Sequence, residues 1–167
     1  MEKIIETIEK DESYMIWRIG ELLIQKKLIS WEQLENALIE QKKTKGFIGD
    51  ILISKKYIAP ALFYKSLADR HSMRFVDLKR TKINRKAVEL IPQSVAEKHR
   101  LMPLEIVRDS LVIGISNPLA ACPAEELKGF SRVKEIRTVL CIPEDIQNAI
   151  NENYTRHTAQ VPPSPFR

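Results

Sequence analysis

Apolar residues follow two different patterns along the chain, and the pattern changes near residue 71. Before that point they recur every three or four positions, as in the pairs Ile19 and Leu23 or Leu34 and Leu38, which is the spacing of amphipathic helices. After it they form short runs bounded by turn residues, which is typical of strands alternating with helices. The pattern therefore predicts an α+β protein, with an all-helical lobe first and a small α/β lobe after it.

The helical part of the chain contains an internal repeat. Residues Arg18–Gln41 and Phe47–Arg70 form two 24-residue segments that align without gaps, and the five-residue spacer Lys42–Gly46 separates them. The alignment pairs Ile19-Gly20 with Ile48-Gly49, Leu23-Ile24 with Leu52-Ile53, Lys26-Lys27 with Lys55-Lys56, Ile29 with Ile58, and Leu38 with Leu67. Agreement at this density indicates a true duplication. Each copy is predicted to form two short helices joined by a turn.

Helix-start signals mark the second helix of each copy. In the first copy, Ser30 and Gln33 have the spacing of a capping box. In the other copy, Pro60 is expected just inside the helix start, where its missing N–H costs nothing. Neither copy can bury its apolar face alone, so the two copies are expected to pack against each other. An amphipathic segment at residues 4–8 predicts one further helix before the repeats.

The lobe after residue 71 is predicted to have the order β-α-β-β-α-β-α. Asn84 is expected to cap its first helix, which Pro92 bends or divides. The other expected elements are strands at 75–78, 101–107, 111–115 and 133–142, a weak helix at 118–130 capped by Asn117, and a last helix from Pro143 to about Tyr154. The predicted organisation is thus a helical lobe at 1–71, an α/β lobe at 72–154, and a flexible Pro-rich tail or linker at 155–167.

Composition and motif searches exclude several classes of protein. The 167 residues are 44% hydrophobic and 29% charged, as in a globular protein with a real core, and no apolar run approaches the ~20 residues of a membrane-spanning helix. The two cysteines do not make a disulfide framework, so a cytosolic setting is expected. None of the five glycines fits a Walker A loop or a G-x-G-x-x-G motif, which excludes the usual nucleotide hydrolases and dinucleotide enzymes.

Catalytic and metal-binding constellations are not expected either. The three histidines lie far apart without ligand spacing, and the pairs Glu125-Glu126 and Glu144-Asp145 lie at predicted helix starts, where they complement the helix dipole. The net charge of +5 comes with interspersed acids and few aromatics, so the basic clusters are interpreted as solvated surface rather than a groove for a nucleic-acid duplex. We therefore expect a protein without catalytic residues, a metal site or a cofactor, and not an enzyme.

The glycines of the repeat, Gly20 and Gly49, are candidate binding residues. Each interrupts a helical segment, where glycine costs about 0.8–1 kcal/mol relative to alanine. Close packing of helices would explain them, and so would the approach of a ligand to the backbone. Arg18 is expected at the start of its helix, where free backbone N–H groups favour an anion.

The repeat resembles a known family. Arg18-Ile19-Gly20-x-x-Leu23-Ile24, followed by Leu34, Ala37-Leu38 and Gln41, is similar to the R-L-G-x-x-L … L-x-x-A-L-x-x-Q repeat in the N-terminal domain of type II secretion and type IV pilus-assembly ATPases. The version of that domain that binds cyclic di-GMP carries two 24-residue motifs joined by a five-residue spacer, as this chain does. The later segments Phe75–Leu78, Leu90–Pro92 and Leu101–Leu104 also fit, so that the similarity covers about residues 15–154.

The resemblance implies a non-catalytic module in which each motif holds one half of a cyclic dinucleotide. Backbone and apolar side chains form a platform, and the arginine and glutamine at the motif ends reach the guanine and phosphate edges. Carried over to this chain, the first motif supplies Arg18, Ile19, Gly20, Leu23, Ile24, Leu38 and Gln41, and the second supplies Ile48, Gly49, Leu52, Ile53 and Leu67.

Four positions depart from the pattern of the ligand-binding members. Phe47 stands in place of the second arginine, Arg70 in place of the second glutamine, and Lys27 and Lys56 in place of glycines. In one interpretation, Arg70 recognises a guanine edge, Phe47 stacks on a base, and the two lysines neutralise phosphates. In the other, the lysines block approach to the backbone and the ligand site is inactive.

The resemblance implies partners as well as a ligand. The leading expectation is a regulatory domain that binds cyclic di-GMP and passes its state to an ATPase motor domain, in the same chain or in another. The alternative is a ligand-free docking module that joins the ATPase to the cytoplasmic domain of an inner-membrane platform protein. Either function would place the chain in the cytoplasm, peripheral to the inner membrane through its partners. The Pro-rich end has the composition of a linker to such a motor.

Overall fold

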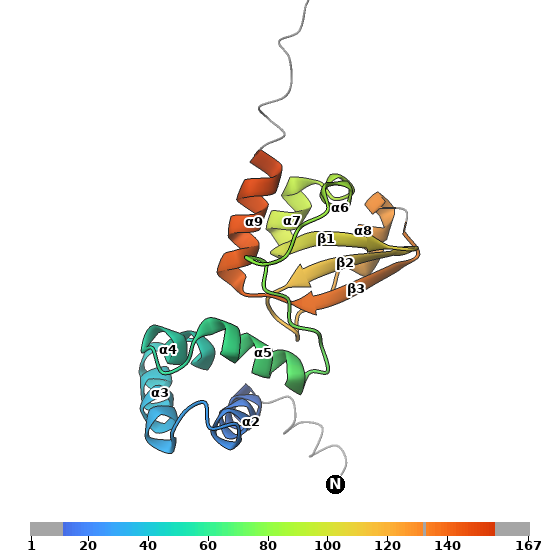
Figure 1. Ribbon diagram of the computed structural model, residues 1–167. Coiled ribbons are helices and arrows are strands. Elements are labelled where there is room, and N and C mark those ends of the chain that lie inside the picture. Colours follow the sequence, from blue (N-terminus) through green and yellow to red (C-terminus); the bar gives the residue numbers. More distant parts are fainter. Residues whose placement is uncertain (1–11, 132, 156–167) are drawn as a thin grey trace, which may run out of the picture. The chain divides into compact units, whose positions relative to one another are not determined.

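The computed structural model describes residues 12–131 and 133–155 (Figure 1). The chain divides into two compact units, Met1–His71 and Ser72–Arg167. The helix expected at residues 4–8 and the Pro-rich stretch 156–167 fall outside the described residues. Among the helices that are described, none is both long and apolar enough to cross a membrane.

In the first unit, each repeat forms two of the described helices. Helices α2 (Glu12–Gln25) and α3 (Trp31–Thr44) belong to the first copy, and α4 (Ile48–Ser54) and α5 (Pro60–Arg70) belong to the second. The predicted capping box begins α3: the Ser30 hydroxyl accepts the Gln33 N–H at 3.2 Å, and Gln33 Oε1 accepts the Ser30 N–H at 2.8 Å. Pro60 lies in the first turn of α5, as predicted.

The two copies of the repeat pack crosswise. Helix α2 makes its main contacts with α5, and α3 makes its main contacts with α4, so the first helix of each copy lies against the second helix of the other. Five pairs of equivalent positions supply most of the buried side chains, namely Ile19 and Ile48, Leu23 and Leu52, Ile29 and Ile58, Leu34 and Phe63, and Ala37 and Ser66. The expectation that the copies bury each other's apolar faces is confirmed.

The second unit is built on a three-stranded sheet. Its elements are α6 (Arg85–Glu89), α7 (Gln93–His99), β1 (Leu101–Val107), β2 (Ser110–Ile115), α8 (Ala124–Ser131), β3 (Glu135–Leu140) and α9 (Pro143–Thr155). The strand order is β1-β2-β3, with β1 and β2 antiparallel and β3 parallel to β2. Helix α8 lies in the crossover connection that a parallel pair requires. Helices α6, α7 and α9 pack against β1 and enclose an apolar core (Figure 1).

The strand expected at residues 75–78 is reduced to a single bridge. Phe75 pairs in parallel with Leu140 at the end of β3. Asp77 then turns the chain, because its Oδ1 accepts the Lys79 N–H at 3.0 Å and its carbonyl accepts the Thr81 hydroxyl at 2.7 Å. These local hydrogen bonds take the backbone away from the edge of β3, so the prediction of a longer strand is wrong.

Two helices also differ from the expected bounds. The helix expected at residues 118–130 begins only at Ala124, and the side chain of Asn117 accepts the Leu119 N–H at 2.9 Å in a turn instead of capping a helix. Pro123 disfavours a helical conformation in the residue before it, which prevents an earlier start. Pro92 divides the first expected helix into α6 and α7, as the sequence allowed.

Candidate functional site

Helix packing explains the glycines of the repeat. A Cβ atom on Gly20 would lie 2.7 Å from Leu34 Cδ2, and a Cβ atom on Gly49 would overlap the ring of Phe63. Because Leu34 and Phe63 are equivalent positions of the two copies, the same contact occurs twice. Both glycines are buried. Of the two explanations that the sequence left open, the structure supports close packing over the approach of a ligand to the backbone.

The turn after the first helix of each copy contains a lysine whose backbone is in the left-handed conformation. Lys27 has φ 56° and Lys56 has φ 58°. In both copies the N–H of the next residue donates to the carbonyl five positions earlier, at 2.9 Å and 3.0 Å, which is the hydrogen bond of a Schellman motif. This conformation favours glycine for a purely local reason, because a side chain there costs roughly 1–2 kcal/mol.

The expected apolar platform divides into buried and half-buried side chains. The buried members belong to the core between the helices and are at most 5% exposed: Ile19, Leu23, Ile48 and Leu52. The half-buried members reach the surface in both copies: Ile24, Leu38, Ile53 and Leu67. Only the second group can offer much surface to a ligand.

The ends of the two motifs have different surroundings. Arg18 lies in the middle of α2, so the prediction that it begins a helix is wrong. The residues before the repeat extend that helix back to Glu12. The backbone N–H groups without a helical partner therefore lie in the first turn, away from Arg18. The Gln41 side chain donates from Nε2 to the Gly46 carbonyl at 3.0 Å and so ties α3 to the spacer. Phe47 is the N-cap residue of α4 and is 75% exposed, whereas Arg70 is half-buried at the end of α5.

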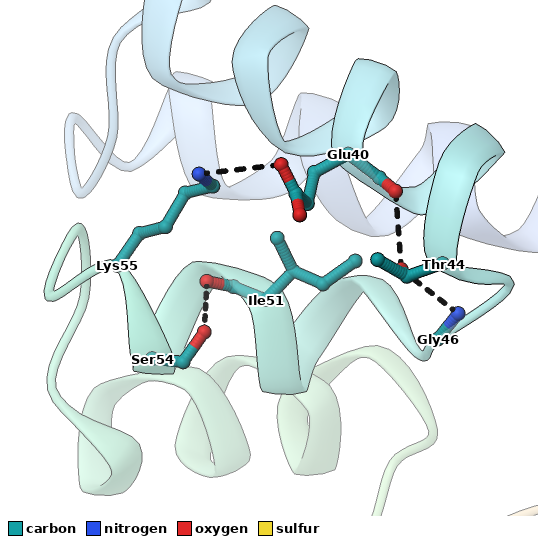
Figure 2. A network of polar contacts seen from close by, with 6 residues as sticks. All are labelled: Glu40, Thr44, Gly46, Ile51, Ser54 and Lys55. Atoms are coloured by element: carbon teal, nitrogen blue, oxygen red, sulfur yellow. Dashed lines mark hydrogen bonds and ion pairs between the residues drawn. The ribbon is translucent and has the colours of Figure 1, made fainter.

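Two surface ion pairs connect the copies at equivalent positions. Lys26 Nζ lies 2.6 Å from Asp69 Oδ2, and Lys55 Nζ lies 3.6 Å from Glu40 Oε2. Figure 2 shows the second pair, with the lysine reaching from the end of α4 to α3. The repeat alignment carries a signal for this pairing that sequence reasoning missed, because it places the two lysines opposite each other and the two acids opposite each other.

Figure 2 also shows how local hydrogen bonds hold the backbone beside this pair. The Thr44 hydroxyl donates to the Glu40 carbonyl at 3.0 Å and accepts the Gly46 N–H at 3.3 Å. The Ser54 hydroxyl donates to the Ile51 carbonyl at 3.0 Å. The last turn of α3, the end of the spacer and the last turn of α4 are therefore held by local hydrogen bonds from the Thr44 and Ser54 hydroxyls.

Positive charge predominates around these turns. A hydrogen bond from Lys26 lowers the pKa of Asp69, so that this carboxylate stays charged. Burial and then the Arg70 guanidinium lower the pKa of His71, which keeps the imidazole neutral at pH 7. The exposed Lys27 adds a further cation. The arrangement favours an anionic ligand or partner.

Known proteins are similar to this chain in sequence, in fold or in both. The chain is 31% identical over 140 residues to the type IV pilus assembly ATPase PilB of Myxococcus xanthus (strain DK1622), which covers 84% of this chain and 25% of that protein. A solved structure of MshE with cyclic di-GMP is 28% identical, with a TM-score of 0.68 over 81% of this chain and 98% of that chain. The N-terminal domain of XpsE has a TM-score of 0.57 at 15% identity, over 81% of this chain and 92% of that chain.

The chain thus spans about a quarter of the length of the Myxococcus relative. The family model of the MshEN domain matches residues 71–160. This stretch begins at the boundary of the two units, so the duplicated repeat precedes it. Because the match takes in more than half of the sequence, this chain belongs to the MshEN domain family, and its α+β fold is that of the N-terminal domains of secretion and pilus-assembly ATPases.

Proposed function

We propose that the helical unit binds cyclic di-GMP across its two repeats and that the domain regulates an ATPase of a pilus or secretion system. The observation that carries this proposal is the pairing of two equivalent repeats in one unit, in a chain similar to MshE, which was solved with cyclic di-GMP. Cyclic di-GMP has two identical halves, so a unit with two equivalent motifs can offer each half the same kind of contacts.

The ends of the motifs would recognise the ligand. Arg18 and Gln41 carry specificity in the first motif. Arg70 replaces the second glutamine as a clamp, because a guanidinium can donate two parallel hydrogen bonds to the O6 and N7 atoms of guanine. Phe47 offers an exposed ring on which a base can stack. The half-buried members of the apolar platform form the floor of the site.

The motor and its partners would lie beyond this domain. The Myxococcus relative is a pilus assembly ATPase, and this chain contains no Walker A loop. In the proposal, ATP hydrolysis belongs to a motor domain in the same chain or another, and the present domain supplies ligand-dependent control. The assembly acts on the cytoplasmic side of the inner membrane, against the cytoplasmic domain of a platform protein.

Isothermal titration calorimetry of the chain with cyclic di-GMP tests the proposal. Binding is expected in the micromolar range or tighter, and Arg18→Ala is expected to abolish it. Cyclic di-AMP serves as the control ligand, because adenine lacks the O6 acceptor that an arginine recognises on guanine. The absence of heat with wild-type protein up to millimolar ligand would refute cyclic di-GMP binding.

The alternative is a ligand-free docking module, and apolar surface on the helical unit favours it. Ile39, Phe47 and Leu62 are 47%, 75% and 45% exposed, and apolar side chains of this kind mark a protein–protein contact where they form a contiguous patch. Copurification with the platform protein's cytoplasmic domain distinguishes the two functions. Equal recovery with and without cyclic di-GMP, together with loss of recovery in Phe47→Ser, would support docking over ligand sensing.

A further inference from the structure

We propose that the outer edge of β3 pairs with the same edge of a second copy of this chain, as two antiparallel strands related by a two-fold axis. Ile136 would lie opposite Ile136 of the second copy, and Glu135 would lie opposite Arg137 of the second copy. The pairing involves the second unit alone and needs no cyclic di-GMP, so it stands independently of the proposed function.

The two outer strands of the sheet differ in how their free edges are protected (Figure 1). Strand β1 contains Pro103, which has no N–H, and its register shifts directly after that residue. The Leu104 carbonyl of β1 also accepts the Asn84 N–H at 2.7 Å. Strand β3 pairs with β2 in an unbroken register, and among the described residues its outer edge is paired only where Leu140 bridges to Phe75. Such an edge can accept another strand.

Four backbone groups of β3 point away from β2. Leu140 shows the direction, because its N–H donates to the Arg74 carbonyl and its carbonyl accepts the Val76 N–H, each at 2.9 Å. Because the direction alternates along a strand, the N–H and C=O groups of Ile136 and Thr138 face the same outer edge. Within residues 12–131 and 133–155, no backbone or side-chain group bonds to these four. They are therefore open to hydrogen bonds from a further strand.

The charged side chains of β3 complement those of an identical strand. Glu135 and Arg137 are exposed, two positions apart on one face, and Arg137 Nε donates to Glu135 Oε2 at 2.9 Å. The Ser110 hydroxyl donates to the same oxygen at 2.7 Å. These hydrogen bonds, that from Arg137 foremost, lower the pKa of Glu135, so its carboxylate is charged at neutral pH. Glu135 Oε1 has no partner in the part of the chain that the structure describes, which leaves it open to a second guanidinium.

These charges select one register. In an antiparallel pair centred on Ile136, Glu135 of each copy lies opposite Arg137 of the other, where directly opposed side chains interact. The same centre pairs the outward backbone groups of Ile136 with their counterparts, which gives two hydrogen bonds. A pair centred on Arg137 would place two guanidinium groups opposite each other, and a parallel pair in register would oppose like charges at both positions. Repulsion disfavours both alternatives.

Charge exchange tests this pairing by sedimentation velocity of the 167-residue chain without cyclic di-GMP. The wild type should pass from monomer to dimer as its concentration rises. Glu135→Arg and Arg137→Glu should each stay monomeric, because like charges then meet at both positions. An equimolar mixture of the two variants, and the double variant, should dimerise again. Lys86→Glu changes the net charge as Arg137→Glu does but lies in α6, so this control should dimerise like the wild type.

Residue-resolved amide hydrogen exchange on the unaltered chain locates the contact. The Ile136 amide should exchange more slowly at concentrations where the dimer forms. The Cys141 amide donates to the Ile115 carbonyl at 2.8 Å and should be protected at every concentration. A wild type that stays monomeric, a dimer that survives either single charge change, or a dimer without slower exchange at Ile136 would overturn the proposal. Because the exchange measurement needs no substitution, it decides the question even where a variant fails to fold.

Discussion

Replacing Lys27 and Lys56 by glycine should stabilise the helical unit. Both residues have a left-handed backbone conformation, with φ 56° and 58°. A side chain costs roughly 1–2 kcal/mol in that conformation. Glycine removes this cost but loses about 0.5–1 kcal/mol more conformational free energy on folding. The difference is a gain of between about 0 and 1.5 kcal/mol at each site, with a midpoint of about 0.8 kcal/mol. The sites lie in different copies, so the two gains should add in the double variant.

Urea unfolding followed by tryptophan fluorescence measures this effect. Both tryptophans, Trp17 and Trp31, belong to the helical unit, so the signal reports on it alone. The midpoint should rise in Lys27→Gly and Lys56→Gly at an unchanged slope. The control is Lys55→Gly, one position before Lys56 at φ −74°, where glycine should destabilise by about 0.5–1 kcal/mol. A lower midpoint for the first two variants, or a higher one for the control, would refute the reasoning.

The same variants distinguish the two interpretations of these lysines. If the ammonium groups bind phosphate, Lys27→Gly and Lys56→Gly will weaken cyclic di-GMP binding while they raise stability. If the side chains block approach to the backbone, glycine will tighten binding. Because the expected changes in stability and affinity have opposite signs in the first case, loss of affinity cannot be attributed to unfolding.

Three further predictions concern other contacts. Gly49→Ala should destabilise the helical unit by about 1–3 kcal/mol, because its methyl group overlaps the buried Phe63 ring; a wild-type unfolding midpoint would contradict that contact. The pKa of Asp69 is lower in the folded chain than in the unfolded chain, so its stabilising charge should be lost as pH falls through and below about 4. Unfolding curves of Asp69→Asn should lack this part of the acid dependence. Tyr154→Phe should cost the second unit about 1 kcal/mol in calorimetry, since the phenol donates to the Ile91 carbonyl at 2.9 Å; an unchanged melting temperature would be the contrary result.

Local signals predicted much of this fold correctly. The capping box at Ser30, the proline start at Pro60 and the break at Pro92 each depend on a few neighbouring residues, and the structure confirms all three. The predictions that failed depend on more distant context. Arg18 does not begin a helix, because residues outside the repeat extend α2, and the strand after Phe75 ends after one bridge, because Asp77 turns the chain.

The sequence by itself determined the α+β class, the duplication, the family resemblance and the residues that compose the candidate site. Only the tertiary structure decided how those residues and their neighbours are placed. It assigned Gly20 and Gly49 to helix packing, placed Lys27 and Lys56 in left-handed turns, and crossed the copies through their helices and ion pairs. The physical reason is the distance along the chain over which each signal acts. Periodicity and capping act over a few residues along the chain, whereas a duplicated unit can pack its helices within a copy or between copies with the same local pattern, and only long-range packing chooses between them.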